Sequence, residues 1–392
     1  MITDRPHPVS LHRTPLAEFH LRHGAHVVPF AGWEMPLYYT SILAEHQAVR
    51  SGVGLFDVSH MGVLGVSGAH AAELLARRTT ADVPRLVPGQ VRYTFFLETA
   101  GGIVDDLLIS RLDDGTSLVR EYVAVPNAGR ADEVEEILRQ HRLPDTNLVR
   151  WNGKTAFLAV QGPRARETLE RTFGWTLSGL AFYHTAWFPA VPGTGGPGGR
   201  LGLGIAQGFP ASYLVSRTGY TGERGYEILL PAEDGDAVAE RLLVAGAVPC
   251  GLAARDTLRL EQGYLLSGQE FQRDHTPLEA GQERFVDFDH EFVGRSALEK
   301  QRTDGPAVLL AGLVVEEEGA IPRHGTPVRL GDVVLGAVTS GGLSPTLGHG
   351  IALAYLPREH AAPGTEVTLS LHGRDVPARV TALPFRTAPK PA

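Results

Sequence analysis

The stretch EVTLSLHGRDVPARV, residues 366–380, alternates apolar and polar side chains with a period of two. This alternation is typical of a β-strand with one buried face, because successive side chains of a strand point to opposite sides. The pair Gly373-Arg374 interrupts the pattern and marks a turn before a second apolar run at 376–380. These residues therefore predict a β-hairpin near the C-terminal end of the chain.

The hairpin belongs to a longer region without helical periodicity, which begins at about Thr303. We therefore expect residues 303–392 to form a separate all-β domain, preceded by a charged and polar linker over 299–305. Residues 1–302 contain both helix and strand patterns, which indicates an α+β region. Helices are predicted over 131–141 and 236–244, and strands over 122–125, 156–160, 213–216 and 226–230.

The composition is that of an ordinary globular protein. The chain has 392 residues, 43% hydrophobic and 20% charged, which is enough for two or three domains. Its formal net charge of −8 argues against binding to nucleic acid or to an anionic membrane surface. No segment approaches the roughly 20 apolar residues of a membrane span, and the first residues lack the apolar stretch of a secretion signal. We therefore expect a cytoplasmic protein.

Metal and thiol chemistry are not expected. The single cysteine, Cys250, lies in the apolar run VAGAVPCGLAA and can form neither an internal disulfide nor a thiolate zinc cluster. His20, His23 and His26 are evenly spaced, but a spacing of three rotates successive residues off a common helix face, and no carboxylate lies beside them. We predict that these histidines are solvated at the surface.

The segment GGIVDDLLIS, residues 101–110, places two acidic residues inside an apolar run. In a strand, Asp105 and Asp106 would face opposite sides, so one carboxylate would point toward a core or a cleft. Burial of a carboxylate is unfavourable unless it meets a cation, a hydrogen-bond donor or a substrate. A functional carboxylate and a turn acid with its charge in water both remain compatible with this spacing.

Two further segments concentrate charged residues. The segment SRTGYTGERGYEILL, residues 216–230, combines glycines and two tyrosines with carboxylates and arginines, which suits a flat heterocycle with amide edges. The segment GLAARDTLRLEQGYLLSGQE, residues 251–270, carries several charges in a helix-like pattern. The alternatives are a glycine-rich connection with surface charges in the first segment and internal ion pairing in the second.

Seven blocks of the sequence occur in the same order in a known family. They are FAGWEMPLYYTSI (30–42), GLFDVSHMG (54–62), GGIVDDL (101–107), SRTGYTGERGYEI (216–228), GLAARDTLRLEQGYLLSGQE (251–270), FVGRSAL (292–298) and SGGLSPTLGHGIALAYL (340–356). These blocks resemble those of the glycine cleavage system T proteins, which are aminomethyltransferases. The resemblance covers nearly the whole chain, and seven ordered blocks are far more specific than any single motif.

The resemblance implies a fold and a reaction. The expected fold is α+β and cloverleaf-like, with two interleaved lobes, a C-terminal antiparallel β-barrel and folate in the central opening. The expected reaction transfers the aminomethyl group from the lipoyl arm of H protein, releases ammonia and forms 5,10-methylenetetrahydrofolate. The expected partners are lipoylated H protein, bound transiently, and tetrahydrofolate, with no metal. Asp106 matches the family's proton acceptor, since a positioned carboxylate accepts protons and stabilises developing positive charge.

The resemblance also implies folate contacts. Glu227 is expected to accept the adjacent N–H donors of the pterin, with Tyr220 in the wall of the ring site. Arg255 is the family-matched cation, and the carboxylates of the folate tail favour a guanidinium partner. Met61 and Tyr93 match positions that line the pterin cavity.

Three places depart from the family pattern. In VAVPNAGR (123–130) relatives read close to VVNAGN, so with Pro126 inserted Asn127 is expected one position away from the usual contact. The segment QERFVDF begins at Gln282, where the family pattern has a more apolar, tryptophan-containing stretch. Arg386 follows a Pro-Phe pair, and relatives often have a tyrosine at that position. These sites are expected to alter affinity or to mark a diverged homologue.

Two other functions compete with this one. The folate-accepting half of a dimethylglycine or sarcosine oxidizing enzyme is disfavoured, because the sequence carries no credible dinucleotide-binding segment. A folate-binding iron–sulfur-assembly protein would carry a cysteine before GQE, but Tyr264 and Leu265 occupy that neighbourhood and Cys250 is too distant. Ammonia release from aminomethyl-loaded H protein and tetrahydrofolate distinguishes the three.

Overall fold

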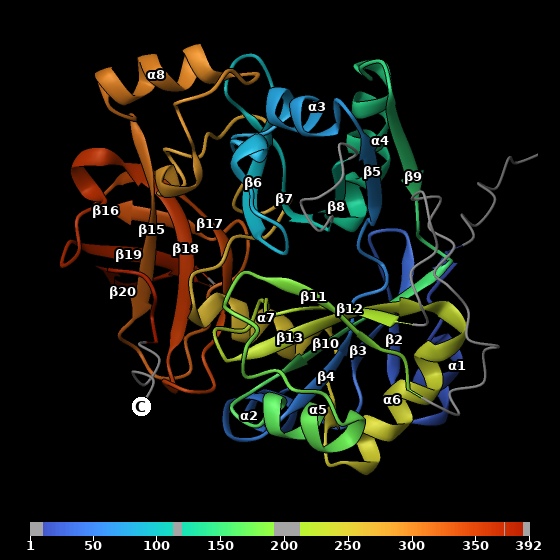
Figure 1. The fold of residues 1–392 in the computed structure, drawn as a ribbon. Helices are drawn as coiled ribbons and strands as arrows, with labels where there is room; N and C mark the ends of the chain where they lie inside the picture. Colours follow the sequence, from blue (N-terminus) through green and yellow to red (C-terminus); the bar gives the residue numbers. More distant parts are fainter. Residues whose placement is uncertain (1–10, 113–119, 192–211, 372, 387–392) are drawn as a thin grey trace, which may run out of the picture.

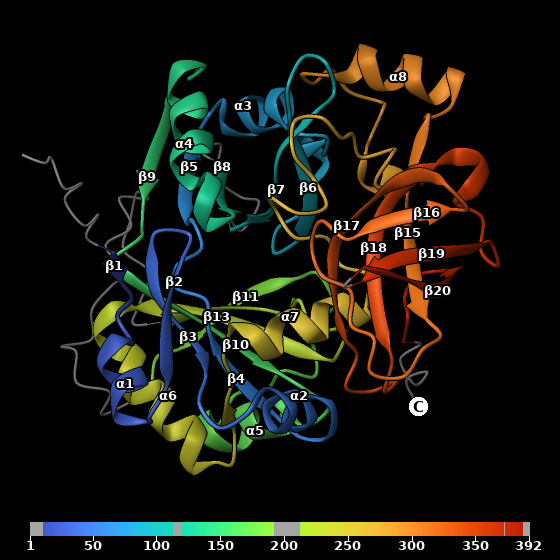
Figure 2. The same ribbon diagram turned by 180° about the vertical axis from the view of Figure 1, so that it is seen from behind.

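The computed structural model describes residues 11–112, 120–191, 212–371 and 373–386. They form two lobes of helices and sheets and a barrel, arranged around a common centre (Figure 1). The view from behind shows the same three units, with helix α7 (Leu252–Glu261) running between the first lobe and the barrel (Figure 2).

The first lobe is built on a six-stranded sheet in the order β11-β12-β13-β10-β4-β14. Helices α1, α5 and α6 pack on one face of this sheet, and α2 and α7 contribute to the core on the other face. A small sheet in the order β1-β3-β2 adjoins it. The bounds are β1 (His12–Arg13), α1 (Ala17–Arg22), β2 (His26–Phe30), β3 (Trp33–Tyr38), α2 (Ile42–Ser51), β4 (Gly54–Asp57), β10 (Thr155–Gln161), α5 (Ala165–Phe173), β11 (Thr185–Pro189), β12 (Ser212–Ser216), β13 (Gly225–Pro231), η3 (Ala232–Asp234), α6 (Gly235–Val244) and β14 (Val248–Pro249).

The second lobe is inserted between β4 and β10 of the first, so the two lobes are interleaved along the chain. Its five-stranded antiparallel sheet has the order β6-β7-β8-β5-β9, with α3 and α4 packed against it. Helix α4 buries Val134 and Leu138, as its spacing of apolar residues predicts. The bounds are β5 (Leu64–Gly68), α3 (Ala71–Arg78), η1 (Val83–Arg85), β6 (Val91–Leu97), β7 (Ile103–Arg111), β8 (Arg120–Pro126), η2 (Ala128–Arg130), α4 (Ala131–Gln140) and β9 (Thr146–Arg150).

The chain after α7 crosses to the second lobe before it enters the barrel. Residues 265–298, which include η4 (Glu283–Phe285) and the start of α8 (Arg295–Asp304), bury apolar side chains against β6 and β7. The polar stretch 299–305, predicted as a linker, is mostly the second half of helix α8, which leads from the second lobe to the barrel. Leu298 of the same helix is fully buried and attaches the helix to the second lobe.

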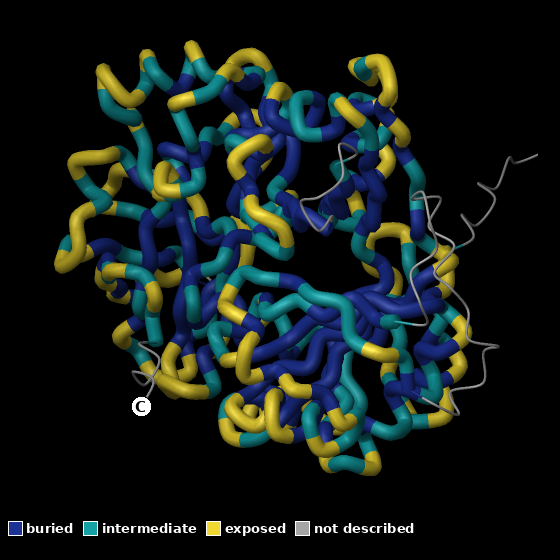
Figure 3. Tube along the Cα trace, viewed as in Figure 1, coloured by how far each residue is buried: buried dark blue, intermediate teal, exposed yellow. Residues whose placement is uncertain are grey.

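The barrel is closed by six antiparallel strands in the order β15-β18-β17-β16-β19-β20. The predicted hairpin is β19-β20, in which Val367 pairs with Ala378. Alternate side chains of each strand fill the barrel interior, which appears as buried chain in Figure 3. The bounds are β15 (Val308–Val315), β16 (Pro327–Leu330), β17 (Val333–Leu343), β18 (Gly350–Pro357), η5 (Arg358–His360), β19 (Glu366–Leu371) and β20 (Arg374–Thr381).

The predicted α+β fold with interleaved lobes and a C-terminal antiparallel barrel is thus confirmed. The prediction for the histidines is wrong at His20, whose side chain is buried and hydrogen-bonds Tyr39 and Asp57 over 2.7 and 2.9 Å. In the described part of the chain, no helix has the length and apolar character needed to cross a membrane. Within the same ranges, no three or more His, Cys, Asp or Glu residues are grouped to hold a metal ion.

Candidate active site

A cavity of about 1520 Å³ lies where the two lobes and the barrel meet. The first lobe contributes β13, α7 and the segment after β4, the second lobe contributes β7 and the segment after β8, and the barrel contributes part of β17. All six residues that the sequence analysis assigned to catalysis or folate binding line it, namely Met61, Tyr93, Asp106, Tyr220, Glu227 and Arg255. The fold therefore gathers side chains that lie up to 194 positions apart in the sequence.

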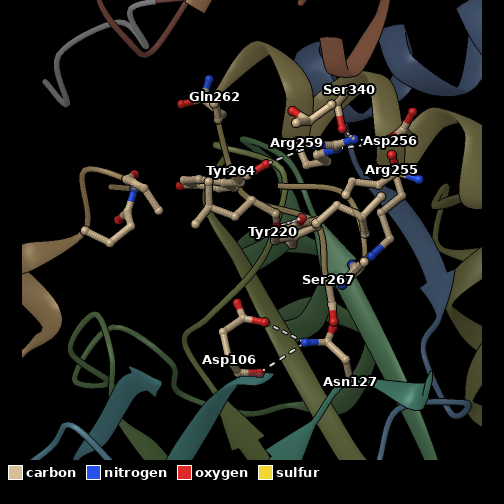
Figure 4. Close-up of a pocket in the computed structure, with 18 of the residues that line it drawn as sticks. Asp106, Asn127, Tyr220, Arg255, Asp256, Arg259, Gln262, Tyr264, Ser267 and Ser340 are labelled. Carbon is tan, nitrogen blue, oxygen red and sulfur yellow. Dashed lines mark hydrogen bonds and ion pairs between the residues drawn. The ribbon is translucent and has the colours of Figure 1, made fainter. Parts of the chain in front are cut away.

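Asp106 lies on β7 and reaches the cavity. Successive side chains of a strand point to opposite faces, so Asp105 takes the other face, where it is fully buried. Both oxygens of the Asp106 carboxylate accept hydrogen bonds. The Tyr93 hydroxyl donates to Oδ2 over 2.6 Å. Nδ2 of Asn127 donates to Oδ1 over 2.5 Å (Figure 4). A carboxylate has about four acceptor positions, so Asp106 retains capacity for a further donor in the cavity.

Asn127 holds the two adjacent carboxylates together. Its Nδ2 lies 2.8 Å from Oδ1 of Asp105, and its backbone N–H donates to Oδ2 of Asp105 over 2.9 Å. Ser267 adds a longer contact of 3.4 Å to Oδ1 of Asp105. Asp105 thereby orients the amide that contacts Asp106. Asn127 directly follows β8 and contacts both carboxylates, although Pro126 precedes it.

The two carboxyl groups titrate away from their usual range. Burial raises the pKa of Asp106 to about 6, although the hydrogen bonds from Tyr93 and Asn127 lower it. Burial and the neighbouring charge of Asp106 raise the pKa of Asp105 well above its ordinary value. Near neutral pH, Asp106 is therefore an ionised carboxylate whose pKa suits a general base.

Glu227 lies on β13 with only 7% of its surface exposed. It accepts a hydrogen bond from the Thr218 hydroxyl. Burial raises the pKa of Glu227, while the Thr218 hydroxyl and the charge of Arg255 lower it. A buried carboxylate with free acceptor capacity in a cavity is suited to a ligand that offers neighbouring N–H donors.

The glycines of the segment before β13 permit its close packing. A Cβ on Gly219 would lie 2.0 Å from Oε1 of Gln161, and Gly222 has a positive φ of +74°. Gln161 is fully buried and donates through Nε2 to the carbonyl of Thr218 over 3.2 Å. The glycines therefore have a packing reason, and the segment is a fixed part of the cavity wall.

Arg255 projects from α7 toward the same end of the cavity. Its guanidinium carbon lies 4.8 Å from the centre of the Tyr220 ring, and Tyr220 stacks on Tyr264 with a centroid distance of 5.6 Å (Figure 4). The Tyr220 hydroxyl donates to the carbonyl of Leu265. Arg255 therefore lies beside Tyr220, which the resemblance assigns to the wall of the pterin site.

Another arginine of α7 ties the first lobe to the barrel. Arg259 is buried and lies 3.0 Å from Glu270, and its NH2 donates to the Ser340 hydroxyl over 2.7 Å. Asp256 forms a further ion pair with it at 2.7 Å. Internal ion pairing therefore explains the buried charge of Arg259, as one interpretation of the sequence held. It does not explain the buried charge of Arg255.

The other two departures from the family pattern are at Gln282 and Arg386. Gln282 lines the cavity, and Phe285 three residues later packs edge-on against Tyr93 at 4.7 Å. Arg386 lies 2.8 Å from Glu223, and its backbone N–H donates to the carbonyl of Glu261. Gln282 and Phe285 shape the cavity, whereas Arg386 attaches the segment after β20 to the first lobe.

The sequence analysis did not single out some residues of the site. Thr218 is in a quoted block, but nothing in the spacing showed which carboxylate its hydroxyl would meet. His60 lies in GLFDVSHMG, is only 4% exposed and lines the cavity. The available signal was a histidine between Ser59 and Met61, in one of the blocks that match the family.

Comparisons with known proteins match both the lobes and the barrel. The GCVT N-terminal domain matches residues 16–193 and 205–290, and the glycine cleavage T-protein C-terminal barrel domain matches residues 309–386. The chain belongs to the glycine cleavage T-protein family. The predicted membership of this family is confirmed, and with it the predicted activity of a tetrahydrofolate-dependent aminomethyltransferase.

Individual relatives of this T-protein family extend over nearly the whole chain. An aminomethyltransferase of Symbiobacterium thermophilum is 42% identical, with 97% of this chain and 98% of that protein covered. One of Halothermothrix orenii is 40% identical, with 95% and 99% covered. The crystal structure of glycine cleavage system aminomethyltransferase T from Bartonella henselae superposes with a TM-score of 0.85 at 33% identity, covering 96% of this chain and 98% of that one.

Proposed function

We propose that the central cavity binds tetrahydrofolate with its pterin between Glu227 and Tyr220, and that Asp106 is the proton acceptor of the aminomethyl transfer. The observation that carries this proposal is the Asp106 carboxylate, which is held by two donors and still faces the cavity. Met61 and Tyr93 line the same cavity and complete the proposed pterin site.

Glu227 binds the pterin in this proposal through its two carboxylate oxygens. The pterin offers two adjacent N–H donors at its amidine edge, and a carboxylate can accept both. Arg255 lies at this end as well, because its guanidinium rests on the Tyr220 ring and its charge acts on Glu227. We therefore assign Arg255 to the pterin. Arg284 and Arg323, which are exposed and line the cavity, are better placed for the tail carboxylates.

Asp106 supplies the acid–base chemistry. Transfer of an aminomethyl group with release of ammonia requires a group that accepts a proton and stabilises positive charge as it develops. An ionised carboxylate does both. Tyr93 and Asn127 fix the carboxylate and restrict its rotation, so that no reorientation is needed during the reaction.

The partner proposed for this reaction is lipoylated H protein. The binding is transient, because the loaded arm must enter the cavity and leave it in each turnover. We propose further that the enzyme acts in the cytoplasm without a metal, and that residues 1–302 and 303–392 are its two functional regions.

The test combines the purified protein with tetrahydrofolate and aminomethyl-loaded H protein and measures ammonia. Stoichiometric ammonia that requires both partners supports the proposal. Ammonia release that does not depend on tetrahydrofolate would contradict it, as would failure to release ammonia with a correctly folded protein and loaded H protein.

A further inference from the structure

Glu45 is a fully buried carboxylate on α2 that the proposed function does not use. Its Oε1 accepts hydrogen bonds from the backbone N–H groups of Tyr39 and Thr40, over 2.6 and 2.9 Å. Its Oε2 accepts a hydrogen bond from the backbone N–H of Gly251 over 2.8 Å. Glu45 therefore joins the connection between β3 and α2 to the start of α7.

Helix α7 begins without a cap of its own. Its N-cap residue is Gly251, which has no side chain, and the third residue of the helix is Ala254. In a capping box, a glutamate at this third position accepts a hydrogen bond from the backbone N–H of the N-cap residue. Glu45 makes the same contact from another helix. Its negative charge near the N-terminus of α7 also suits the helix dipole.

Close packing explains why the N-cap residue is a glycine. A Cβ on Gly251 would lie 2.3 Å from the carbonyl oxygen of Leu37 and 2.6 Å from the backbone nitrogen of Tyr38, at the end of β3. Both atoms belong to the backbone, so they cannot move aside as the tip of a side chain can. The usual capping residues, such as serine or aspartate, are therefore excluded at position 251. The start of α7 depends on Glu45 instead.

The rest of α7 has separate contacts with α2, which lies beside it (Figure 2). Nδ1 of His46 lies 2.8 Å from Oγ1 of Thr257, in the middle of α7. NH2 of Arg50 donates to Oε2 of Glu261 over 2.6 Å, at the end of α7. The loss of the contact at the start would therefore leave the middle and the end of the helix attached.

Arg255 is the first charged residue of α7. Its backbone N–H donates to the carbonyl of Gly251 over 3.2 Å, in the first turn of the helix. Its side chain lines the cavity, with the guanidinium carbon 4.8 Å from the centre of the Tyr220 ring. NH1 of Arg255 is buried and has no hydrogen-bond partner among the described residues. The position of this group therefore depends on the Tyr220 ring and on the place where α7 begins.

We propose that Glu45 is a positioning residue for tetrahydrofolate binding, because it fixes the start of α7 and thereby the guanidinium of Arg255 in the cavity. The inference rests on the proposed function, in which Arg255 contacts the pterin. Glu45 itself does not line the cavity. Asp106 is held from the second lobe by Tyr93 and Asn127, so the effect of Glu45 falls on binding and not on the proton transfer.

The first test substitutes Glu45→Gln. The amide oxygen should face the two donors of Tyr39 and Thr40, so the amide N–H groups then face the N–H of Gly251. We expect Kd and KM for tetrahydrofolate to rise about three- to tenfold, the scale of substitutions that act on a binding group without touching the ligand. The saturated rate of ammonia release should stay within about twofold.

The second test distinguishes positioning from a general loss of stability. Arg255→Met should itself weaken tetrahydrofolate binding. If Glu45 acts through Arg255, adding Glu45→Gln to Arg255→Met should change Kd by less than about twofold. An equal loss of affinity from Glu45→Gln in both backgrounds would contradict the proposal, because the effect would not depend on Arg255.

Thr257→Val is the matched control. It removes the contact with His46 from the same pair of helices, and Thr257 does not line the cavity. Tetrahydrofolate affinity should stay within about twofold of the wild type, even if the melting temperature falls. A loss as large as that of Glu45→Gln would show that any disturbance of the helix pair suffices, and the specific role of Glu45 would be wrong.

A shorter carboxylate keeps the proposal testable if Glu45→Gln does not fold. Glu45→Asp retains the charge and retracts the acceptor from Gly251, so it takes the place of Glu45→Gln in the same measurements. Loss of folding in both variants would show that Glu45 is a structural residue, and would overturn the proposal.

The same measurements distinguish this inference from the proposed function. Normal tetrahydrofolate binding by Arg255→Met would overturn the assignment of Arg255 to the pterin, and the proposal for Glu45 with it. Weakened binding by Arg255→Met together with normal binding by Glu45→Gln would overturn the proposal for Glu45 alone.

Discussion

The hydroxyl of Tyr93 donates a hydrogen bond to Oδ2 of Asp106 over 2.6 Å. The Tyr93 ring is held edge-on by Phe95 and Phe285, with centroid distances of 5.3 and 4.7 Å. The donor therefore has a fixed position, and it stabilises the charged form of a carboxyl group whose surroundings disfavour charge. The hydrogen bond therefore helps to keep the proposed base Asp106 ionised, whereas burial favours its protonated form.

Replacing Asp106 by asparagine should nearly abolish turnover. The amide keeps the shape and removes the proton acceptor, and general-base contributions are typically about 10²- to 10⁴-fold. Tetrahydrofolate affinity should change little. Ammonia release and titration calorimetry measure the two effects.

A matched control for Asp106→Asn is Asp234→Asn. Asp234 is a buried aspartate that accepts a hydrogen bond from Tyr213 over 2.9 Å and does not line the cavity. Its substitution should leave turnover within about twofold, since no catalytic contact is lost. Near-normal activity of Asp106→Asn would instead direct attention to Asp105.

The pH dependence of turnover should report Asp106. Its pKa is raised to about 6, so the base is ionised above this pH and becomes protonated as the pH falls through it. We expect the saturated rate to fall below about pH 6. Tyr93→Phe removes a donor that favours the charged form, so the pKa should rise and the acid limb should move to higher pH. An unchanged acid limb in Tyr93→Phe would show that another group controls it.

Substitution of Glu227 by alanine should weaken tetrahydrofolate binding more than it slows saturated turnover. The proposed contact exists in the ground state and in the transition state alike, so its loss raises KM and Kd with little effect on kcat. A charged hydrogen bond contributes about 1.5–3 kcal/mol, which corresponds to roughly a ten- to hundredfold loss of affinity. Titration calorimetry with unchanged affinity would contradict the assignment.

Arg259→Met should destabilise the junction between the first lobe and the barrel. It would leave Glu270 buried without its cation, which typically costs about 3–5 kcal/mol. Urea unfolding should show this loss. Adding Glu270→Gln to Arg259→Met should recover part of it, because the unpaired charge is then absent. A further decrease of similar size in the double variant would show that the Arg259–Glu270 charge pair does not account for the loss.

Association with H protein should be partly electrostatic. H proteins are expected to be acidic, and this chain carries a net charge of −8, so a local basic surface must overcome the overall repulsion. Raising the ionic strength should therefore raise the apparent KM for loaded H protein, with a smaller effect on tetrahydrofolate. A KM that stays flat or falls with salt would exclude charge steering.

Local patterns in the sequence determined much of this protein. The period-two alternation at 366–371 fixed a strand of the barrel, and the apolar spacing in 131–141 fixed helix α4, because each pattern depends only on neighbouring residues. Seven ordered blocks identified the family. The placement of Asp105 and Asp106 on opposite faces also followed from strand geometry alone.

Only the tertiary structure decided which polar groups meet. Asn127 lies 21 positions from Asp106, and Arg255 lies 28 positions from Glu227, so no local pattern connects them. The burial of His20 was likewise beyond the sequence, because desolvation depends on segments packed from elsewhere in the chain. Periodicity is set by neighbouring residues, whereas charge, protonation and hydrogen bonding in a cavity are set by long-range packing.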